Sequence, residues 1–207
     1  MEKQTGRLEA FSDGIFGVAI TLLAIEIGIA EYDGATNLNL WQKITEKWPE
    51  YFAYFNSFAT VLLIWMGHHK ILNKIWKATH QIILINGLLL LFVVLFPYPT
   101  KMVGTFIGTP AVNTAVSFYA GFTGLIVVCM LLLNICIMRN RKAIIHPDKD
   151  IPWLNNMMKG QMIGIAVYAL AAVIAFYQPN ISLALTFGMW VFWAIVTKDT
   201  NEDAGED

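Results

Sequence analysis

Long apolar runs dominate this sequence and constrain its fold more than any motif does. Six of them approach the roughly 20 residues that a helix needs to cross the hydrocarbon core of a bilayer: residues 8–30, 49–68, 80–98, 111–138, 160–177 and 180–197. Hydrophobic residues make up 57% of the 207, well above an ordinary soluble domain. Because a segment in lipid must pair its own backbone groups, we predict an all-α, polytopic membrane protein with six transmembrane helices.

The connections between these runs are too short to hold a hydrophobic core of their own. We therefore predict one six-span membrane domain over residues 1–198. Residues 199–207, "DTNEDAGED", are acidic and lack apolar side chains other than one alanine, which predicts a disordered tail. The net charge of -1 gives no basic surface for nucleic acid.

The basic residues are sorted by side in this layout. With a cytoplasmic N-terminus, 11 of the 14 lysine and arginine residues face the cytoplasm and 3 face outward. The inner set is Lys3, Arg7, Lys70, Lys74, Lys77, Arg139, Arg141, Lys142, Lys149, Lys159 and Lys198. The outer set is Lys43, Lys47 and Lys101. Since positive loops stay inside, we predict that both termini are cytoplasmic.

Motifs that would support an enzyme are missing from the sequence. It has no P-loop, no His-Glu-x-x-His, no pair of CxxC motifs and no Gly-x-Ser-x-Gly. We expect no enzymatic activity, no cofactor and no bound metal beyond a permeating ion. Cys129 and Cys136 lie seven residues apart on one run, too far along a helix for a disulfide, so we expect two buried thiols.

The first run carries a stripe of small and apolar residues along one side. On a helical wheel Gly14, Val18, Thr21 and Ile25 share this narrow stripe, with Leu22 at its edge. Small residues often serve only to let helices pack closely. The alternative is a pore lining, which requires several copies of the stripe around one axis and hence a symmetric oligomer.

Asp13 stands at the entrance of the same run, where an ionisable group usually pairs with something. It is either an ion ligand or a structural tether. Trp65, His68 and His69, near the end of the second run, offer N–H donors at the same predicted depth. A bond from one of them would hold the first helix to the second, although the two histidines can also be an ordinary interfacial pair.

The pattern Arg7-x-x-x-Phe11-Ser12-Asp13, followed by "ITLLAIEI" and later by Trp65 and "HHK", resembles the transmembrane protein 175 family of potassium channels. The resemblance is most specific in the first motif and elsewhere covers the six-span layout. It implies a potassium-permeable channel whose first helix lines the pore. A single repeat resembles the prokaryotic form, which implies a homotetramer in a prokaryotic plasma membrane, surrounded by lipid and conducting potassium ions.

The resemblance also implies roles for particular residues. Val18 matches the hydrophobic constriction, where the family more often has isoleucine or leucine. Thr21 matches the pore-facing threonine, and Leu22 and Ile25 match further apolar layers. Arg7, Phe11, Ser12 and Asp13 form the structural motif, with Trp65, His68 and His69 as its partner network and Gly14 as a pore-lining position.

Physical reasoning limits how such a pore selects ions. The sequence lacks the Thr-Val-Gly-Tyr-Gly filter, and carbonyls in a continuous helix are already hydrogen-bonded. Apolar side chains can only narrow and dewet the path, so an ion passes when it sheds water cheaply, which favours potassium over sodium. Glu26, Glu31 and Asp33 near the outer end either concentrate cations or form a solvated helix end.

The leading hypothesis is thus a homotetrameric potassium-selective channel without a voltage sensor, since no run repeats arginine or lysine every third residue. A proton-conducting channel is the first alternative, because His68, His69 and Asp13 lie near the inner mouth. A secondary transporter is a weaker one, supported only by the mid-membrane amides Asn86, Asn134 and Gln161. The last alternative is a purely structural membrane protein.

Overall fold

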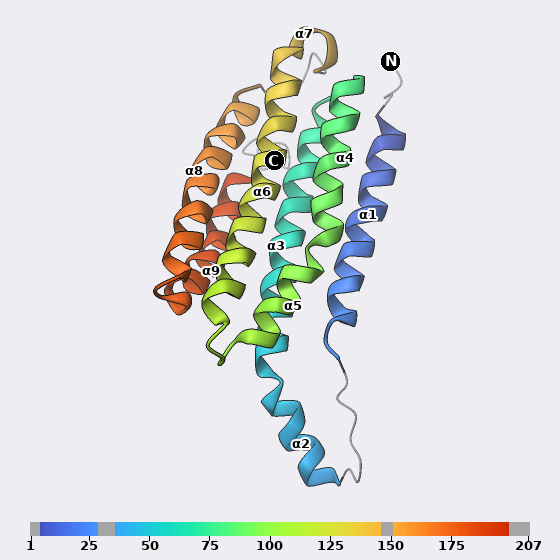
Figure 1. Ribbon diagram of the computed structural model, residues 1–207. Helices are drawn as coiled ribbons and strands as arrows, with labels where there is room; N and C mark the ends of the chain where they lie inside the picture. Colours follow the sequence, from blue (N-terminus) through green and yellow to red (C-terminus); the bar gives the residue numbers. More distant parts are fainter. Residues whose placement is uncertain (1–4, 29–35, 146–150, 199–207) are drawn as a thin grey trace, which may run out of the picture.

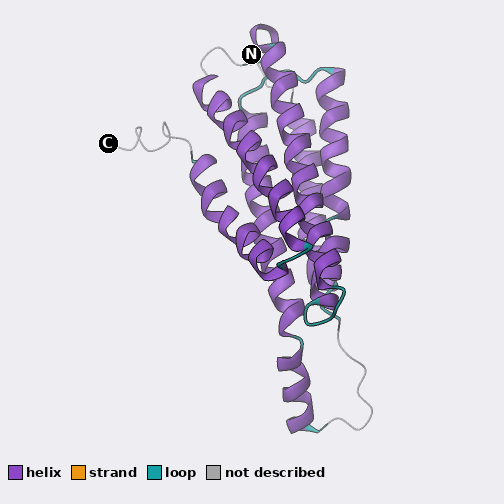
Figure 2. Ribbon diagram, turned by 60° about the vertical axis from the view of Figure 1, so that its left-hand side comes forward, coloured by secondary structure: helices purple, strands orange, loops and turns teal. Residues whose placement is uncertain are grey.

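The chain folds into a bundle of long helices that run up and down side by side (Figure 1). The computed structural model describes residues 5–28, 36–145 and 151–198. Its long elements are α1 (Gly6–Ile25), α3 (Trp48–Asn73), α4 (His80–Leu95), α6 (Val112–Arg139), α8 (Ile151–Ala175) and α9 (Pro179–Val196). The shorter ones are α2 (Asn37–Glu46), α5 (Pro97–Phe106) and α7 (Arg141–Ile144). The described residues contain no strand beyond an isolated bridge between Ile75 and Ile145, which confirms the all-α prediction (Figure 2).

Among the described residues, five segments are long and apolar enough to cross a membrane. They are Gly6–Ile25, His80–Phe106, Val112–Arg139, Pro152–Ala175 and Pro179–Val196. The predicted span 49–68 lies in α3, which has 26 residues and reaches about 39 Å. Buried polar side chains such as Asn56 and Ser57 lower its hydropathy, and α3 is not among the five. The count of six spans therefore stays a prediction.

The hydropathy pattern predicts a loop that begins with the segment "PYPTKMVGTFIGTP", residues 97–110. This prediction is wrong for the first ten residues. They form α5, which continues the direction of α4 after a break at Phe96. Pro97 and Pro99 lie in the first turn of α5, where a helix does not need their missing N–H groups. The prolines therefore end α4 and begin a second helix instead of a loop.

Two further boundaries differ from the prediction. The polar connection between the first two runs contains α2, whose ten residues are too few to register in a 20-residue hydropathy window. α8 begins at Ile151, nine residues before the predicted run 160–177. Its first turns carry exposed Asn155, Asn156 and Lys159, which lower hydropathy without breaking a helix.

The described chain begins and ends on the same side of the bundle. Thr5 Oγ1 donates to the carbonyl of Ile75, and Trp153 Nε1 donates to the carbonyl of Lys198. We call this side the terminal end, and the opposite side, from which α2 extends, the α2 end (Figures 1 and 2). The predicted orientation of the ends across a membrane is not tested by this arrangement. Lys3, Lys149, Glu31, Asp33 and the acidic tail 199–207 lie outside the described residues.

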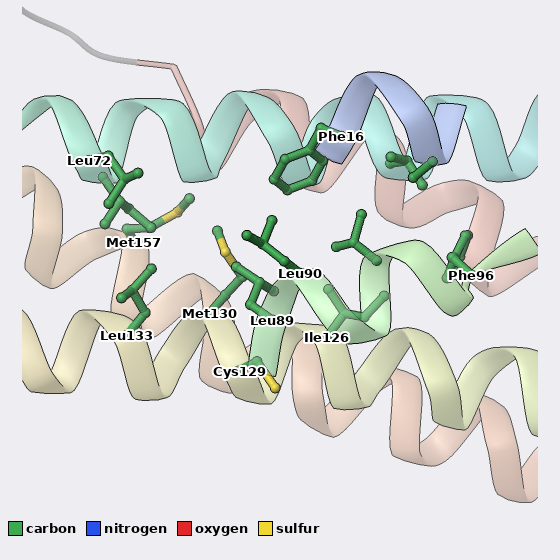
Figure 3. Packing of buried hydrophobic residues seen from close by; sticks show 14 of the residues in the cluster. Phe16, Leu72, Leu89, Leu90, Phe96, Ile126, Cys129, Met130, Leu133 and Met157 are labelled. Atoms are coloured by element: carbon green, nitrogen blue, oxygen red, sulfur yellow. The ribbon is translucent and has the colours of Figure 1, made fainter. Parts of the chain in front are cut away.

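The core lies between α1, α3, α4 and α6, and α6 also packs against α8 and α9. Phe16 from α1 faces Leu89 and Leu90 of α4 and Met130 of α6 (Figure 3). The two cysteines are buried and free, as expected, and Cys129 is part of this core. The packing fixes one face of α1 against the bundle and leaves the other face open.

Candidate ion pathway and its anchor

α1 has a buried face and an uncovered face, and both are apolar. Phe16, Ala19 and Leu23 are almost fully buried against the bundle. On the other side Val18 is 52% exposed and Ile25 is 72% exposed. The helix stands at the edge of the bundle, so nothing else in the described chain covers this side (Figure 1). An uncovered apolar face of this kind must meet lipid or another copy of the chain.

The stripe predicted from the helical wheel lies on this uncovered face. Gly14 and Thr21 are exposed beside Val18 and Ile25, and Leu22 at the edge is half-buried. A Cβ added at Gly14 would meet nothing within 4 Å. The small residue therefore does not serve close packing within the chain. Thr21 donates its hydroxyl proton to the carbonyl of Val18 at 2.8 Å, which leaves its oxygen lone pairs facing outward as acceptors.

Asp13 is held by a tryptophan of α3. Trp65 Nε1 donates to Asp13 Oδ1 at 2.8 Å, and both side chains are half-buried. His69, another partner considered for Asp13, instead lies with its ring 5.5 Å from the Trp65 ring. The bond joins α1 to α3 near the terminal end. Asp13 therefore makes the kind of contact that is expected of a structural tether.

Ser12 belongs to a second polar link that joins three helices. Asn86 of α4 donates through Nδ2 to Ser12 Oγ at 3.0 Å, and its Oδ1 lies 2.7 Å from His68 Nε2. The amide oxygen can only accept, so this contact is a hydrogen bond in the tautomer of His68 that carries its proton on Nε2. Ser12 in turn donates to the carbonyl of Leu8. All three side chains are buried, so the link is a hydrogen-bonded contact inside the bundle.

The structure does not bring the whole sequence motif together. Arg7 and Phe11 are exposed on the surface of α1, away from Ser12 and Asp13. Asn86 takes part instead, although the sequence marked it only as a polar residue within a span. A lone amide in the apolar run 80–98 was the available signal, since buried amides are normally hydrogen-bonded.

The other two amides predicted at mid-membrane, Asn134 and Gln161, also form a hydrogen bond within the bundle. Asn134 Nδ2 of α6 donates to Gln161 Oε1 of α8 at 3.0 Å, and both residues are buried. Helix contacts therefore account for the amides that had suggested a transporter. Among the described residues, no group of three or more His, Cys, Asp or Glu side chains is arranged to hold a metal ion.

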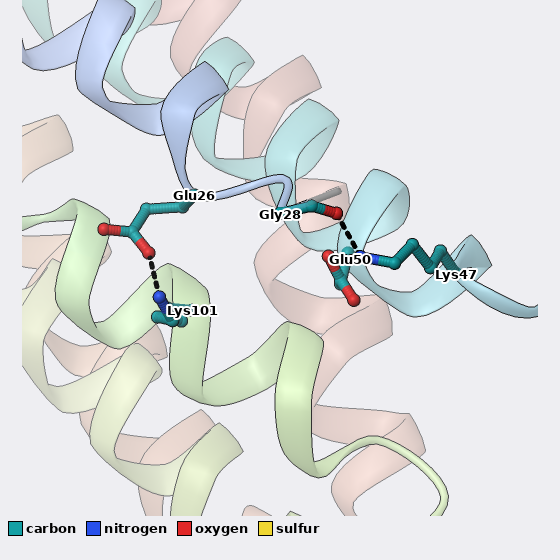
Figure 4. A network of polar contacts seen from close by, with 5 residues as sticks. All are labelled: Glu26, Gly28, Lys47, Glu50 and Lys101. Atoms are coloured by element: carbon teal, nitrogen blue, oxygen red, sulfur yellow. Dashed lines mark hydrogen bonds and ion pairs between the residues drawn. The ribbon is translucent and has the colours of Figure 1, made fainter. Parts of the chain in front are cut away.

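Charged residues surround the last turn of α1 at the α2 end. Glu26 forms an ion pair with Lys101 of α5 at 2.7 Å, and Lys47 donates to the carbonyl of Gly28 and pairs with Glu50 at 3.2 Å (Figure 4). They line a cavity of about 190 Å³. The two carboxylates of this group are balanced by two lysines. Glu31 and Asp33 lie outside the described residues, so the attraction of cations by Glu26, Glu31 and Asp33 stays a prediction.

Comparison with known proteins gives relatives along the whole chain. The family described as endosomal/lysosomal potassium channel TMEM175 matches residues 7–97. A potassium channel of Chamaesiphon minutus is 30% identical over 202 residues, covering 94% of this chain and 95% of that protein. A potassium channel of Streptomyces collinus is 29% identical over 185 residues, 87% of each chain.

A solved structure has the same fold. The crystal structure of a lysosomal potassium-selective channel TMEM175 homolog from Chamaesiphon minutus has a TM-score of 0.84 and 29% identity, and covers 96% of this chain and 100% of that one. A helical membrane bundle with these relatives falls in the class of ion channels and is not an enzyme. The chain belongs to the TMEM175 family, as its first-helix motif had indicated.

The animal relatives match a smaller part of this chain, and their names give a different ion. The bovine endosomal/lysosomal proton channel TMEM175 is 36% identical over 110 residues, which is 50% of this chain and 23% of the bovine protein. The names of family members thus differ in the ion: they give potassium for the bacterial proteins and protons for the animal ones.

The link through Asn86 makes a prediction about stability. Asn86→Ala should destabilise the bundle by about 1–3 kcal/mol, because it leaves Ser12 and His68 without their partner in a buried place. Thermal unfolding in detergent micelles measures the change. Asn155→Ala, the same substitution at an exposed position of α8, is the control. Equal unfolding temperatures for the two variants would show that the link contributes nothing.

Proposed function

We propose that four copies of this chain assemble around a common axis and form a potassium-selective channel lined by α1. The main support for this proposal is the uncovered apolar face of α1. This face holds Gly14, Val18, Thr21 and Ile25, whereas the opposite face packs into the bundle. Only a symmetric arrangement lets such a face enclose a path. Bacterial relatives named as potassium channels support the choice of ion.

Within this channel the narrowest part is a hydrophobic constriction. Val18, Leu22 and Ile25 supply apolar layers from each copy, and Thr21 supplies hydroxyl oxygens between them. α1 is a continuous helix from Gly6 to Ile25, so its interior carbonyls are hydrogen-bonded within the helix and cannot replace the hydration shell of an ion. Selection then depends on how cheaply an ion loses water at the apolar layers, which favours potassium.

The motif at the start of α1 has a positioning role in this proposal. Asp13 and Ser12 hold the pore helix through Trp65, Asn86 and His68. None of these bonds needs a permeating ion. Family resemblance assigns Arg7 and Phe11 to the same motif and His69 to its partner network.

The remaining features of the proposed layout are those predicted from the sequence. The six-span channel domain covers residues 1–198, and the acidic residues 199–207 form a tail. Both termini are cytoplasmic in a prokaryotic plasma membrane, with lipid around the outer helices. The terminal end is then the inner mouth and the α2 end the outer one, in agreement with the lysines and arginines that gather at the terminal end.

Two measurements test the proposal directly. Native mass determination in mild detergent should give a tetramer, and potassium-loaded liposomes containing the protein should release potassium faster than sodium-loaded ones release sodium. A monomer, or vesicles that stay closed to both ions, would contradict it. Val18→Asn, which places an amide in the apolar layer, should change the flux if α1 lines the path.

A proton-conducting channel is the second candidate function. Within the described part of the chain, the buried Nδ1 atoms of His68 and His69 have no hydrogen-bond partner. The animal relatives are named as proton channels. A pH gradient across liposomes without other permeant ions separates the two functions. A current under that gradient would favour protons, and its absence together with potassium flux would favour the first proposal.

The charges at the outer mouth give a further prediction. Glu26→Gln should lower potassium conductance at low ionic strength, because it leaves the positive charge of Lys101 unbalanced beside the path. The double variant with Lys101→Gln removes both charges and should conduct as the unmodified protein does. Single-channel recording in dilute potassium chloride compares them. If the double variant is as poor as the single one, Glu26 attracts cations by itself.

A further inference from the structure

α2 presents large apolar side chains that the described chain leaves uncovered. Trp41 is 67% exposed and Trp48, at the start of α3, is 57% exposed. Leu40 and Ile44 are also exposed. At 100° per residue Leu40, Trp41 and Ile44 fall within an arc of about 100° on α2, and we call these three residues together with Trp48 the α2 stripe. An apolar stripe of this kind on a helix normally packs against another apolar surface.

The sequence specifies α2 as a helix in spite of its length. Thr36 and Asn39 form a reciprocal capping box, in which Asn39 Oδ1 accepts from the Thr36 N–H at 2.6 Å. Gln42 donates to Glu46 one turn later at 3.0 Å. Ten residues are nevertheless marginal as an isolated helix in water. A tertiary contact has to add stability, and within the chain α2 packs mainly against the start of α3.

The position of α2 restricts what this partner can be. The helix extends from the end of the bundle, beyond the long helices (Figures 1 and 2). Its ten residues reach about 15 Å. Lipid chains cover the sides of the bundle but do not extend along its axis. In the proposed orientation α2 thus projects into water, where a protein surface can cover its apolar side chains.

The same position places α2 beside the end of the pore helix. Lys47, between α2 and α3, donates to the carbonyl of Gly28 just after α1 (Figure 4). In the proposed tetramer the four α1 helices converge on the axis, so the end of each α1 brings the α2 helix of its own copy towards those of its neighbours. A second copy of this chain then offers α2 a matching apolar surface at that level.

We propose that the α2 stripe packs against a neighbouring copy and that the four α2 helices form a collar around the outer mouth. The polar side chains of Asn39, Gln42, Lys43 and Glu46 then face water. Apolar burial drives association in water but not between helices in lipid. The collar therefore lies in water, where burial of apolar side chains stabilises the contact between subunits. This inference rests on the proposed tetramer.

Cross-linking of the full-length protein in liposomes tests the collar. Ile44→Cys places a thiol on the stripe, and Gln42→Cys places one about 160° away on the polar side of the same helix. Both are exposed positions, and the natural cysteines are buried. With a short bis-maleimide, Ile44→Cys should give at least tenfold more covalent dimer than Gln42→Cys. Trp41→Cys is a second stripe position in case the Ile44 thiols point apart.

The oligomeric state separates failure of the collar from failure of the channel. A tetramer by native mass in which stripe and polar positions cross-link equally, or not at all, would overturn the collar and leave the proposed channel standing. A monomer by native mass would overturn both. Preferential cross-linking at Ile44 or Trp41 within a tetramer is the result that supports the collar.

Discussion

Replacing Val18 by alanine should lower the permeability ratio of potassium over sodium by at least about threefold, which corresponds to about 0.7 kcal/mol. The substitution removes two methyl groups from each of four subunits at the proposed constriction. A wider apolar ring lets sodium keep more of its water, so the difference in dehydration cost between the ions shrinks. Reversal potentials in planar bilayers with potassium on one side and sodium on the other measure the ratio.

Val191→Ala is the matched control for this experiment. Val191 is exposed on α9, away from the face of α1 that carries the stripe. The control removes the same methyl groups from a surface that the proposal places against lipid, and its permeability ratio should equal that of the unmodified channel. If both variants keep the original ratio, selection occurs somewhere other than at Val18.

Asp13→Ala should reduce the yield of tetramer more than tenfold while the assembled fraction keeps its ion preference. The substitution leaves Trp65 Nε1 without its acceptor. Loss of such a bond costs about 1–2 kcal/mol in each subunit, and a tetramer contains it four times. Native mass determination gives the yield, and reversal potentials give the preference.

Trp65→Phe removes the same bond from the other side and completes a double-variant cycle. If the two residues act through this bond alone, the double variant should assemble about as well as the poorer single variant. A fully assembled Asp13→Ala channel with altered ion preference would contradict the tether and indicate that Asp13 meets the ion.

Much of the fold could be predicted because lipid imposes a simple rule on sequence. Every long helix of the bundle overlaps one of the apolar runs, since a segment in hydrocarbon has to be predominantly apolar over about 20 residues. Boundaries were less predictable where polar residues continue a helix, as in the first turns of α8. α2 was missed because its few apolar residues are diluted by polar neighbours.

The candidate site was predictable in part for a similar reason. Helical periodicity places Val18 and Ile25 on one face of α1 whatever the tertiary structure is, and the structure leaves that face uncovered. The partners across helices depend on how the helices rotate against one another. Trp65 could be suggested by its depth, whereas the link through Asn86 and the pairing of Glu26 with Lys101 required the packing itself.

The permeability ratio of potassium over sodium, measured in a bilayer of defined composition, tests the central claim most directly. A potassium-selective channel lined by α1 should give a reversal potential clearly displaced towards the potassium equilibrium potential. The displacement should be smaller for Val18→Ala than for Val191→Ala. A reversal potential that does not distinguish potassium from sodium would contradict the proposed channel.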